Sequence, residues 1–148
     1  MYENLKLTNL TPLEIQKYLD IKYPSFYIDE LTEVILGKST KGYKNFTYNE
    51  WFFPAHFEDD PNVPAYVQVE ALRQCLLMAF LPLPQYKNKK INIISCNAQF
   101  KIKILPGHKL EIETILETTQ NSVIEGKAVG YINGEVACQI KLKLSITD

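Results

Sequence analysis

The chain has 148 residues, which fits one domain that can bury a core without disulfides or metal ions, and we expect a single domain over residues 1–148. Hydrophobic residues make up 46% and charged residues 22%, which is the globular range and excludes a disordered chain. The formal net charge of −1 argues against a nucleic-acid-binding protein, because such domains usually carry a strong basic excess.

The first expected elements precede a proline-rich loop. Thr11-Pro12-Leu13-Glu14 has the pattern of a capping box with proline at the first helical position, and it predicts a short helix that ends at Tyr23-Pro24. Residues 26–36 favour a strand and Gly37-Lys38 a turn. Residues 39–48 favour a second strand, because they are rich in aromatic residues and threonine.

A long apolar segment follows the loop. Pro54, Pro61 and Pro64 exclude regular structure before it. Residues 65–81 are long enough for a helix and are apolar nearly all round, so this helix must be wrapped by other structure. Pro82 ends it.

The rest of the chain predicts a sheet. Its β-rich segments are residues 91–105, 109–119, 122–132 and 135–146, and the first of them is either one long bent strand or two. Pro106-Gly107 predicts a turn, and Asn133-Gly134 predicts a type I′ hairpin. One antiparallel sheet curled around one apolar helix satisfies this order, which predicts an α+β hot-dog fold. Its free edge strand favours dimerisation by edge pairing.

The cysteines and the N-terminus indicate the compartment. Cys75, Cys96 and Cys138 form no CxxC pair or cysteine–histidine cluster, so we expect free thiols in a reducing compartment and no metal site. The N-terminal stretch has no apolar signal region, and no segment reaches the ~18 apolar residues of a membrane span. We therefore expect a soluble, cytoplasmic protein without a membrane partner.

His56 and Glu70 are the candidate catalytic residues. Histidine titrates near neutral pH and suits proton abstraction, whereas a carboxyl group in apolar surroundings holds its proton more tightly and can act as a general acid. Glu70 lies between Val69 and Ala71 in the expected helix. Backbone N–H groups at the helix start near Ala65 would stabilise negative charge on a carbonyl oxygen. Together these groups would suit proton abstraction beside a carbonyl with loss of a β-hydroxyl.

Both residues also have a structural interpretation. A lone histidine between aromatic residues is often structural. Glu70 has Arg73 at i+3 and Gln74 at i+4, which allows an ordinary ion pair on a helix surface. Composition and spacing alone leave both interpretations open.

The loop and helix resemble the FabZ-type β-hydroxyacyl-[acyl-carrier-protein] dehydratases of type II fatty acid synthesis. The motif of that family runs N-x-T-x-N-E-x-F-F-x-G-H-F-P-x-x-P-x-x-P-G-V and precedes a helix that carries E-A-x-x-Q. The residues that match are Asn45, Thr47, Asn49, Glu50, Phe52, Phe53, His56, Phe57, Pro61, Pro64, Glu70, Ala71 and Gln74. Tyr23-Pro24, Ile28-Asp29 and the segment from Phe100 to Gly107 extend the resemblance over nearly the whole chain.

The resemblance implies roles for these residues. His56 would take the α-proton, and Glu70 would assist departure of the β-hydroxyl as water, which leaves a trans-2-enoyl thioester. The two residues would come from different protomers of a homodimer, with a trimer of dimers as a larger assembly. The backbone N–H of Ala65 would polarise the thioester carbonyl, and Lys101 and Lys103 would contact the acidic carrier protein. No metal or organic cofactor is implied.

Several positions depart from the family pattern. Alanine replaces glycine at Ala55 and Ala65. Tyr66 and Gln68 replace aliphatic residues of the substrate tunnel, to which Phe57 also belongs, and predict a shorter or more polar tunnel. Arg73 replaces a small residue of the family, and a cation at this position would favour the ionised form of Glu70.

These departures predict a specialised dehydratase for an unusual acyl chain, or one of reduced activity. One alternative is a non-catalytic hot-dog module that binds an acyl chain or completes a heterodimer. A hot-dog thioesterase ranks third, because it would leave the histidine loop unexplained. His108 is interpreted as a turn residue without a catalytic role.

Overall fold

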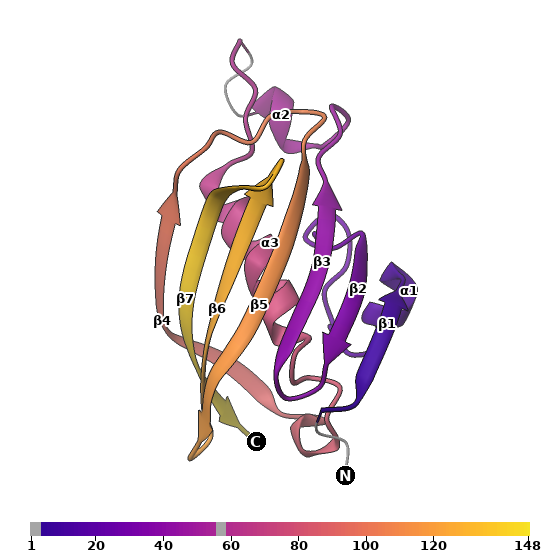
Figure 1. Cartoon of the computed structure of the whole chain (residues 1–148), viewed down its shortest axis with the longest axis vertical. Helices are drawn as coiled ribbons and strands as arrows, with labels where there is room; N and C mark the ends of the chain where they lie inside the picture. Colours follow the sequence, from indigo (N-terminus) through magenta and orange to yellow (C-terminus); the bar gives the residue numbers. More distant parts are fainter. Residues whose placement is uncertain (1–3, 56–58) are drawn as a thin grey trace.

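The computed structural model describes residues 4–55 and 59–148, which form a curled antiparallel sheet with one long helix behind it (Figure 1). The sheet has seven strands in the order β1-β2-β3-β5-β6-β7-β4. The elements are β1 (Lys6–Leu10), α1 (Pro12–Ile15), β2 (Glu30–Ile35), β3 (Ser39–Asn45), α2 (Phe52–Ala55), α3 (Ala65–Leu77), the 3-10 helix η1 (Pro84–Tyr86), β4 (Lys90–Phe100), β5 (Lys109–Gln120), β6 (Val123–Ile132) and β7 (Glu135–Thr147).

The N-terminal part contains a strand that the sequence does not signal. β1 pairs antiparallel with β2, and Leu10 lies opposite Leu31. Its short, mostly polar sequence has no clear alternation, so only pairing with β2 defines it. The helix after it is confirmed but shorter than expected. Its capping box is present, because the backbone N–H of Thr11 donates to Glu14 Oε1 at 3.3 Å.

The strand expected over residues 26–36 begins at Glu30 instead. The backbone N–H of Tyr27 donates to Gln74 Oε1 at 2.8 Å, a helix side chain, and Asp29 is the residue of this segment that donates its N–H to β3, at the carbonyl of Tyr43. Asp29 Oδ2 in turn accepts from the backbone N–H of Asn45 at 2.6 Å, at the point where β3 ends. Side chains therefore add to the backbone hydrogen bonds at this end of the sheet.

The central helix packs against the inner face of β3, β5, β6 and β7. It ends at Leu77 and not at residue 81, because the carbonyl of Ala79 accepts from the backbone N–H of Gly37 and Pro82 has no N–H to donate. α3 has 13 residues, and no helix in the described part of the chain is long and apolar enough to cross a bilayer.

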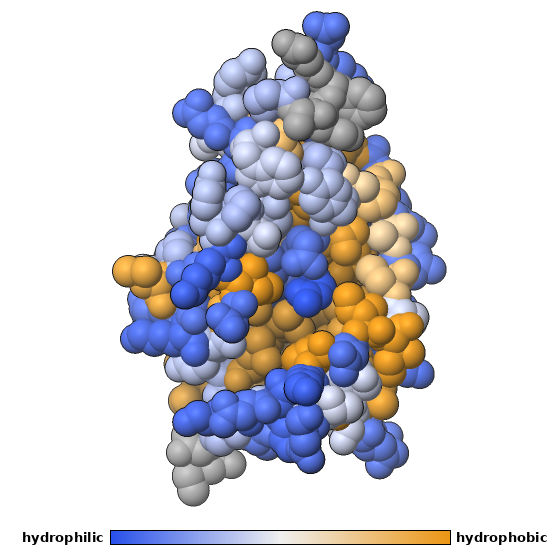
Figure 2. Space-filling view, turned by 180° about the vertical axis from the view of Figure 1, so that it is seen from behind, coloured by the Kyte–Doolittle hydropathy of each residue, from blue (hydrophilic) through white to orange (hydrophobic). Residues whose placement is uncertain are grey.

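α3 is not apolar all round. Its buried side facing the sheet contains Val67, Ala71, Leu72, Cys75 and Leu76. Tyr66 is 56% exposed and Glu70 and Arg73 are half-buried, so a polar stripe at spacing i, i+4, i+7 faces away from the sheet. Figure 2 shows this side of the molecule, with hydrophobic side chains spread around a few hydrophilic ones.

The C-terminal strands form the expected antiparallel meander only in part: β5, β6 and β7 pair in chain order, whereas β4 pairs with β7 at the edge of the sheet and not with β5. β4 is one strand with a register shift between Ile93 and Ser95, and it ends at Phe100 and not at residue 105. Asn133 and Gly134 have φ of 50° and 82°, as a type I′ hairpin between β6 and β7 requires. β4 pairs with β7 on one side, and no strand in the described part of the chain pairs with its other edge. A curled antiparallel sheet around one central helix is the hot-dog fold predicted from the sequence.

Candidate active site

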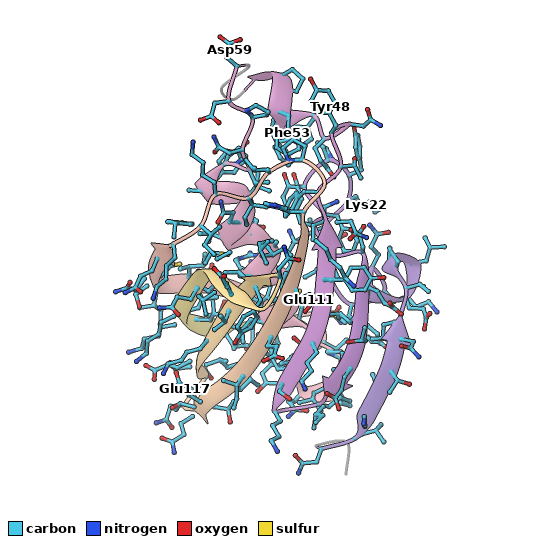
Figure 3. All side chains as sticks on the ribbon, turned by 45° about the horizontal axis from the view of Figure 1, so that its top comes forward. Lys22, Tyr48, Phe53, Asp59, Glu111 and Glu117 are labelled. Carbon is cyan, nitrogen blue, oxygen red and sulfur yellow. The ribbon has the colours of Figure 1, made fainter. Side chains whose placement is uncertain are left out.

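The loop that carries the predicted base is described only on its two sides, because His56 and Phe57 lie outside the described residues. α2 ends directly before them, and Asp59 follows them. Figure 3 shows Phe53 and Asp59 at the same end of the molecule, together with Tyr48.

Aromatic packing holds α2 against the core. Phe52 and Phe53 are 1% and 2% exposed. The ring of Phe52 lies 4.8 Å from that of Phe53, 6.0 Å from that of Phe46 and 6.5 Å from that of Tyr27. The chain therefore enters the histidine loop from a fixed position.

A buried lysine ties β3 to the segment before α2. Lys44 is 8% exposed, and its Nζ lies 2.8 Å from Glu50 Oε1 and 3.6 Å from Asp29 Oδ2. This contact was not predicted, although Lys44 falls on the inward positions of β3 that alternate from Thr40 to Phe46. A lysine on the buried side of a strand predicts an acidic partner, and Glu50 is that partner.

Glu70 is held from both sides by its own helix. Its side chain is 33% exposed, and its Oε2 accepts a hydrogen bond from Gln74 Nε2 at 3.1 Å. Arg73 Nε lies 3.6 Å from Glu70 Oε1, which is within ion-pair range but beyond the length of a good hydrogen bond. The i+3 ion pair that the sequence allows is therefore present.

Gln74 is itself fixed by the backbone. It is fully buried, its Oε1 accepts from the N–H of Tyr27, and its Nε2 donates to the carbonyl of Ser25 at 2.7 Å. Burial is the largest influence on the neighbouring Tyr27 hydroxyl, and it raises the pKa of Tyr27 above its ordinary value of 10.0. From the sequence, Gln74 was predicted only to be a neighbour of Glu70. In the structure its side chain forms three hydrogen bonds, to Tyr27, Ser25 and Glu70.

Arg73 leaves donors unsatisfied within one chain. Its side chain is 20% exposed, while its Nε and Nη1 atoms are buried and have no hydrogen-bond acceptor among the described residues. Buried guanidinium donors without acceptors are costly. An acceptor from outside this single chain would satisfy them.

The start of α3 offers free backbone donors. Val67 and Gln68 donate their N–H groups to the carbonyl of Pro64, at 3.1 and 3.2 Å. Within the described ranges the N–H groups of Ala65 and Tyr66 have no acceptor, as is usual for the first residues of a helix. These groups are available to a carbonyl oxygen.

The two predicted tunnel residues of α3 do not line one wall. Tyr66 is largely exposed on the outer stripe, whereas Gln68 is 5% exposed. Residues two positions apart on an α-helix are rotated by about 200° around its axis, so the side chains of Tyr66 and Gln68 point to nearly opposite sides of α3. Gln68 Nε2 donates to the carbonyl of Val63 at 2.9 Å, and its Oε1 is buried with no donor among the residues that the structure describes.

A cavity of about 440 Å³ brings four predicted residues together. Its lining residues are Asn62, Val63, Ala65, Gln68, Phe100, Lys101, Ile102 and Lys103. Lys103 Nζ forms a 2.5 Å ion pair with Asp60, whereas Lys101 has no ion-pair partner in the parts of the chain that are described. The predicted carrier contacts thus lie at the same cavity as the start of α3.

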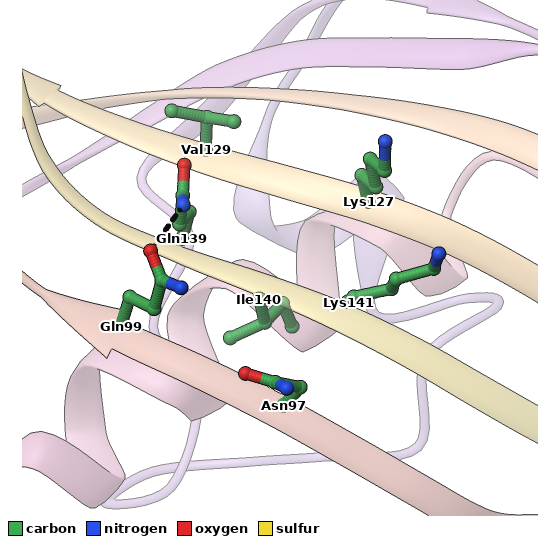
Figure 4. Close-up of a pocket in the computed structure, with 7 residues that line it drawn as sticks. All are labelled: Asn97, Gln99, Lys127, Val129, Gln139, Ile140 and Lys141. Carbon is green, nitrogen blue, oxygen red and sulfur yellow. Dashed lines mark hydrogen bonds between the residues drawn. The ribbon is translucent and has the colours of Figure 1, made fainter.

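A second cavity, of about 280 Å³, lies on the strands β4, β6 and β7 (Figure 4). Polar side chains line most of it, and Gln139 Nε2 donates to Gln99 Oε1 at 2.7 Å. Lys127 and Lys141 lie opposite one another in it. It contains no residue that the sequence predicts for the site.

The fold and the carboxylate on the central helix place the protein in the hot-dog class, and the family follows from its sequence. A family model described as a FabA-like domain matches residues 24–141, so the chain belongs to the FabA-like family. It is 34% identical over 134 residues to the 3-hydroxyacyl-[acyl-carrier-protein] dehydratase FabZ of Clostridium novyi (strain NT), covering 90% of this chain and 94% of the relative. The FabZ of Clostridium botulinum (strain Hall) is 37% identical over 130 residues, covering 87% and 90%.

Solved structures share the fold at low sequence identity. The dehydratase heterocomplex ApeI:P from Xenorhabdus doucetiae matches with a TM-score of 0.73 at 11% identity, over 90% of this chain and 91% of that one. Cj0977, a sigma28-regulated virulence protein from Campylobacter jejuni, matches with a TM-score of 0.70 at 14% identity, over 92% and 89%.

Proposed function

We propose that the protein is a hydro-lyase that removes water from a β-hydroxyacyl thioester carried on an acyl carrier protein, in fatty acid synthesis or a related lipid or polyketide pathway. The observation that carries this proposal is the 34–37% identity to FabZ dehydratases over nearly the full length of both chains. The position of Glu70, partly exposed and fixed by Gln74, supports it.

The proposed reaction divides the chemistry between two groups. His56 takes the proton from the carbon next to the thioester carbonyl, and the electrons of that C–H bond form the new double bond. Glu70 donates a proton to the β-hydroxyl as its C–O bond breaks, so water leaves and a trans-2-enoyl thioester remains. The free N–H of Ala65 would hold the carbonyl oxygen while charge builds on it.

A second copy of the chain would complete the site. The outer edge of β4 is unpaired over its 11 residues, and Ile93, Ile94 and Phe100 are 52%, 51% and 46% exposed. A long, partly apolar edge strand is normally covered in a native assembly. We propose a homodimer paired through β4, with a trimer of dimers as the larger form, in which His56 of one copy faces Glu70 of the other.

The proposal also includes the carrier protein as a partner and the cellular location of the enzyme. Lys101 and Lys103 would contact the acidic carrier protein by charge complementarity. The cytoplasm is the proposed location, because the three cysteines are free thiols, as expected in a reducing compartment.

One observation favours a second candidate, a weakly active or non-catalytic module that binds an acyl chain or completes a heterodimer. Arg73 lies beside the carboxylate that the chemistry needs in its protonated form. The guanidinium lies 3.6 Å from Glu70 Oε1 and would compete with a substrate hydroxyl for this carboxylate. A hot-dog thioesterase has no such support.

The test is direct. Purified protein is mixed with β-hydroxyacyl carrier thioesters of several chain lengths, and formation of the conjugated enoyl thioester is followed by absorbance and mass spectrometry. We expect elimination of water by the wild type and none by His56→Ala. A folded wild-type protein that binds acyl carriers without converting any of them would establish the second candidate, and release of free acid would indicate a thioesterase.

A further inference from the structure

A single arginine, Arg73, lies beside the proposed acid. It is the only arginine in the sequence, in which the other basic side chains are lysines and two histidines. Arginine keeps its charge when it is partly buried, and its planar set of N–H groups matches the oxygens of a carboxylate better than the ammonium group of lysine does. The residue type at this position therefore favours a carboxylate as ligand.

The guanidinium has no hydrogen bond in the described parts of the chain. Its Nε and Nη1 atoms are buried without an acceptor. The side chain is 20% exposed and Nη2 is not one of the buried nitrogens, so a ligand can approach the guanidinium at Nη2. The contact with Glu70 spans 3.6 Å, which is an ion pair without a good hydrogen bond. A largely buried cation with one accessible N–H edge needs an anion.

The position of Arg73 determines which anion can reach it. Tyr66, Glu70 and Arg73 lie on one stripe of α3 that faces away from the sheet. Arg73 Nε lies 3.6 Å from Glu70 Oε1, so a β-hydroxyl bound at Glu70 would bring the next carbons of the acyl chain alongside the guanidinium. An anionic group on the fifth carbon, two bonds beyond the β-carbon, would lie next to Nη2.

We propose that Arg73 binds a carboxylate of the acyl group itself, so that the preferred substrates are β-hydroxyacyl thioesters of dicarboxylic acids with the second carboxylate at the fifth carbon. This inference rests on the proposed function and names the class of substrate for the same site. The substrate carboxylate accepts from Nη2 and draws the guanidinium away from Glu70 Oε1, which leaves that oxygen to the β-hydroxyl. With a plain alkyl chain, Arg73 stays on Glu70 and competes with the hydroxyl.

Two substrates of the same shape test this inference. 3-Hydroxyglutaryl and 3-hydroxy-5-methylhexanoyl groups differ only in that an isopropyl group replaces the carboxylate, and both are loaded onto the same acyl carrier protein. For the wild type we expect kcat/KM to be about 10- to 100-fold higher for the 3-hydroxyglutaryl thioester, the usual effect of a hydrogen bond to a charged group.

Variants of Arg73 separate its charge from its bulk. Arg73→Met keeps most of the volume and has no donor, so it should lower kcat/KM for 3-hydroxyglutaryl about 10- to 100-fold. It should convert the isopropyl substrate at least as fast as the wild type, because Glu70 loses its competitor. Arg73→Lys keeps the charge and should retain part of the preference. Lys17→Met, at an exposed lysine after α1, is the control and should keep the wild-type ratio of the two substrates.

The outcomes distinguish the inference from the proposed function. A wild type that does not favour the carboxylate, but dehydrates either substrate or 3-hydroxybutyryl on the carrier, would overturn the role of Arg73 and leave the dehydratase intact. An equal loss on both substrates in Arg73→Met would also overturn it, because the guanidinium would then contact a second copy or support the fold. An unchanged preference in that variant would assign the carboxylate to another group. A folded wild type that dehydrates none of the three would refute the proposed function, and the inference with it. Circular dichroism and thermal unfolding verify the fold of each variant.

Discussion

Glu70 Oε2 lies 3.1 Å from Gln74 Nε2, one helical turn away, and this single contact connects the proposed acid to the backbone of another part of the chain. Gln74 is bonded at the same time to the N–H of Tyr27 and the carbonyl of Ser25. A carboxylate on a helix surface would normally move between rotamers. Here its position is set by a buried amide that cannot move.

Glu70→Gln should abolish dehydration without unfolding the protein. The substitution keeps the shape of the side chain and removes the proton donor, and we expect kcat to fall by about 10²- to 10⁴-fold, the usual contribution of general acid–base catalysis. KM should change little. Glu125→Gln, on the sheet surface beside Lys143, is the matched control and should retain wild-type kcat. Retention of more than a tenth of wild-type kcat by Glu70→Gln would remove it from the acid role.

Gln74→Leu should lower both stability and activity. The change leaves the N–H of Tyr27 and the carbonyl of Ser25 without their partner, and we expect a loss of about 2–4 kcal/mol in the free energy of unfolding. Urea unfolding measures this loss. Gln139→Leu, whose half-buried side chain bonds to Gln99 on the surface of the sheet, should cost less than about 0.5 kcal/mol. Equal losses for the two variants would contradict the assigned role of Gln74.

Lys44→Met should loosen the approach to the histidine loop. It removes the partner of Glu50, and because Glu50 remains partly exposed we expect about 2–3 kcal/mol of destabilisation, less than for a fully buried pair. Activity should fall further than stability predicts, since α2 begins just after Glu50. Lys41→Met on the same strand, whose 3.9 Å pair with Glu33 is exposed, should be nearly neutral. If Lys44→Met left both the free energy of unfolding and the activity unchanged, the ion pair would not position the segment before α2.

The cysteines should report the proposed dimer interface. Burial raises the pKa of the Cys138 thiol to about 12 and that of Cys75 further still, so neither should react with a disulfide reagent in native protein at pH 8. Cys96, exposed on β4, should be the one thiol that reacts, and its rate should fall as the protein concentration rises if β4 pairs with a second copy. A rate independent of concentration across the monomer–dimer transition would place the interface elsewhere.

The free energy of unfolding should decline at alkaline pH through Tyr27. Burial raises its pKa in the folded state above the unfolded value near 10, so its contribution is complete below pH 10 and is lost as pH rises through the folded pKa. Tyr27→Phe should make the decline above pH 10 shallower, as measured by urea unfolding at each pH. An unchanged slope would mean that Tyr27 does not titrate differently in the two states.

The strongest sequence signals correspond to features that the chain determines locally. The capping box at Thr11 and Glu14, the hairpin at Asn133-Gly134 and the alternation of β5, β6 and β7 depend on contacts close in sequence or on a simple period, and each was predicted. β1 was missed because its pairing partner, β2, is what defines it. The start of β2 was misplaced because a glutamine on α3 takes the bond that a neighbouring strand would have made.

The features of the candidate site also fall into two groups, those that the sequence predicts and those that only the folded chain reveals. The sequence by itself determined the fold class, the family and the presence of Glu70 on a central helix, because motif spacing and hydrophobic periodicity are properties of the chain order. Only the tertiary structure decided that Gln74 anchors Glu70 to the segment of Tyr27, that Lys44 pairs with Glu50, and that Gln68 keeps an unpaired oxygen beside a cavity. Spacing along the chain places Gln74 one turn from Glu70, but the choice of Tyr27 and Glu50 as partners depends on burial and direction in the folded chain.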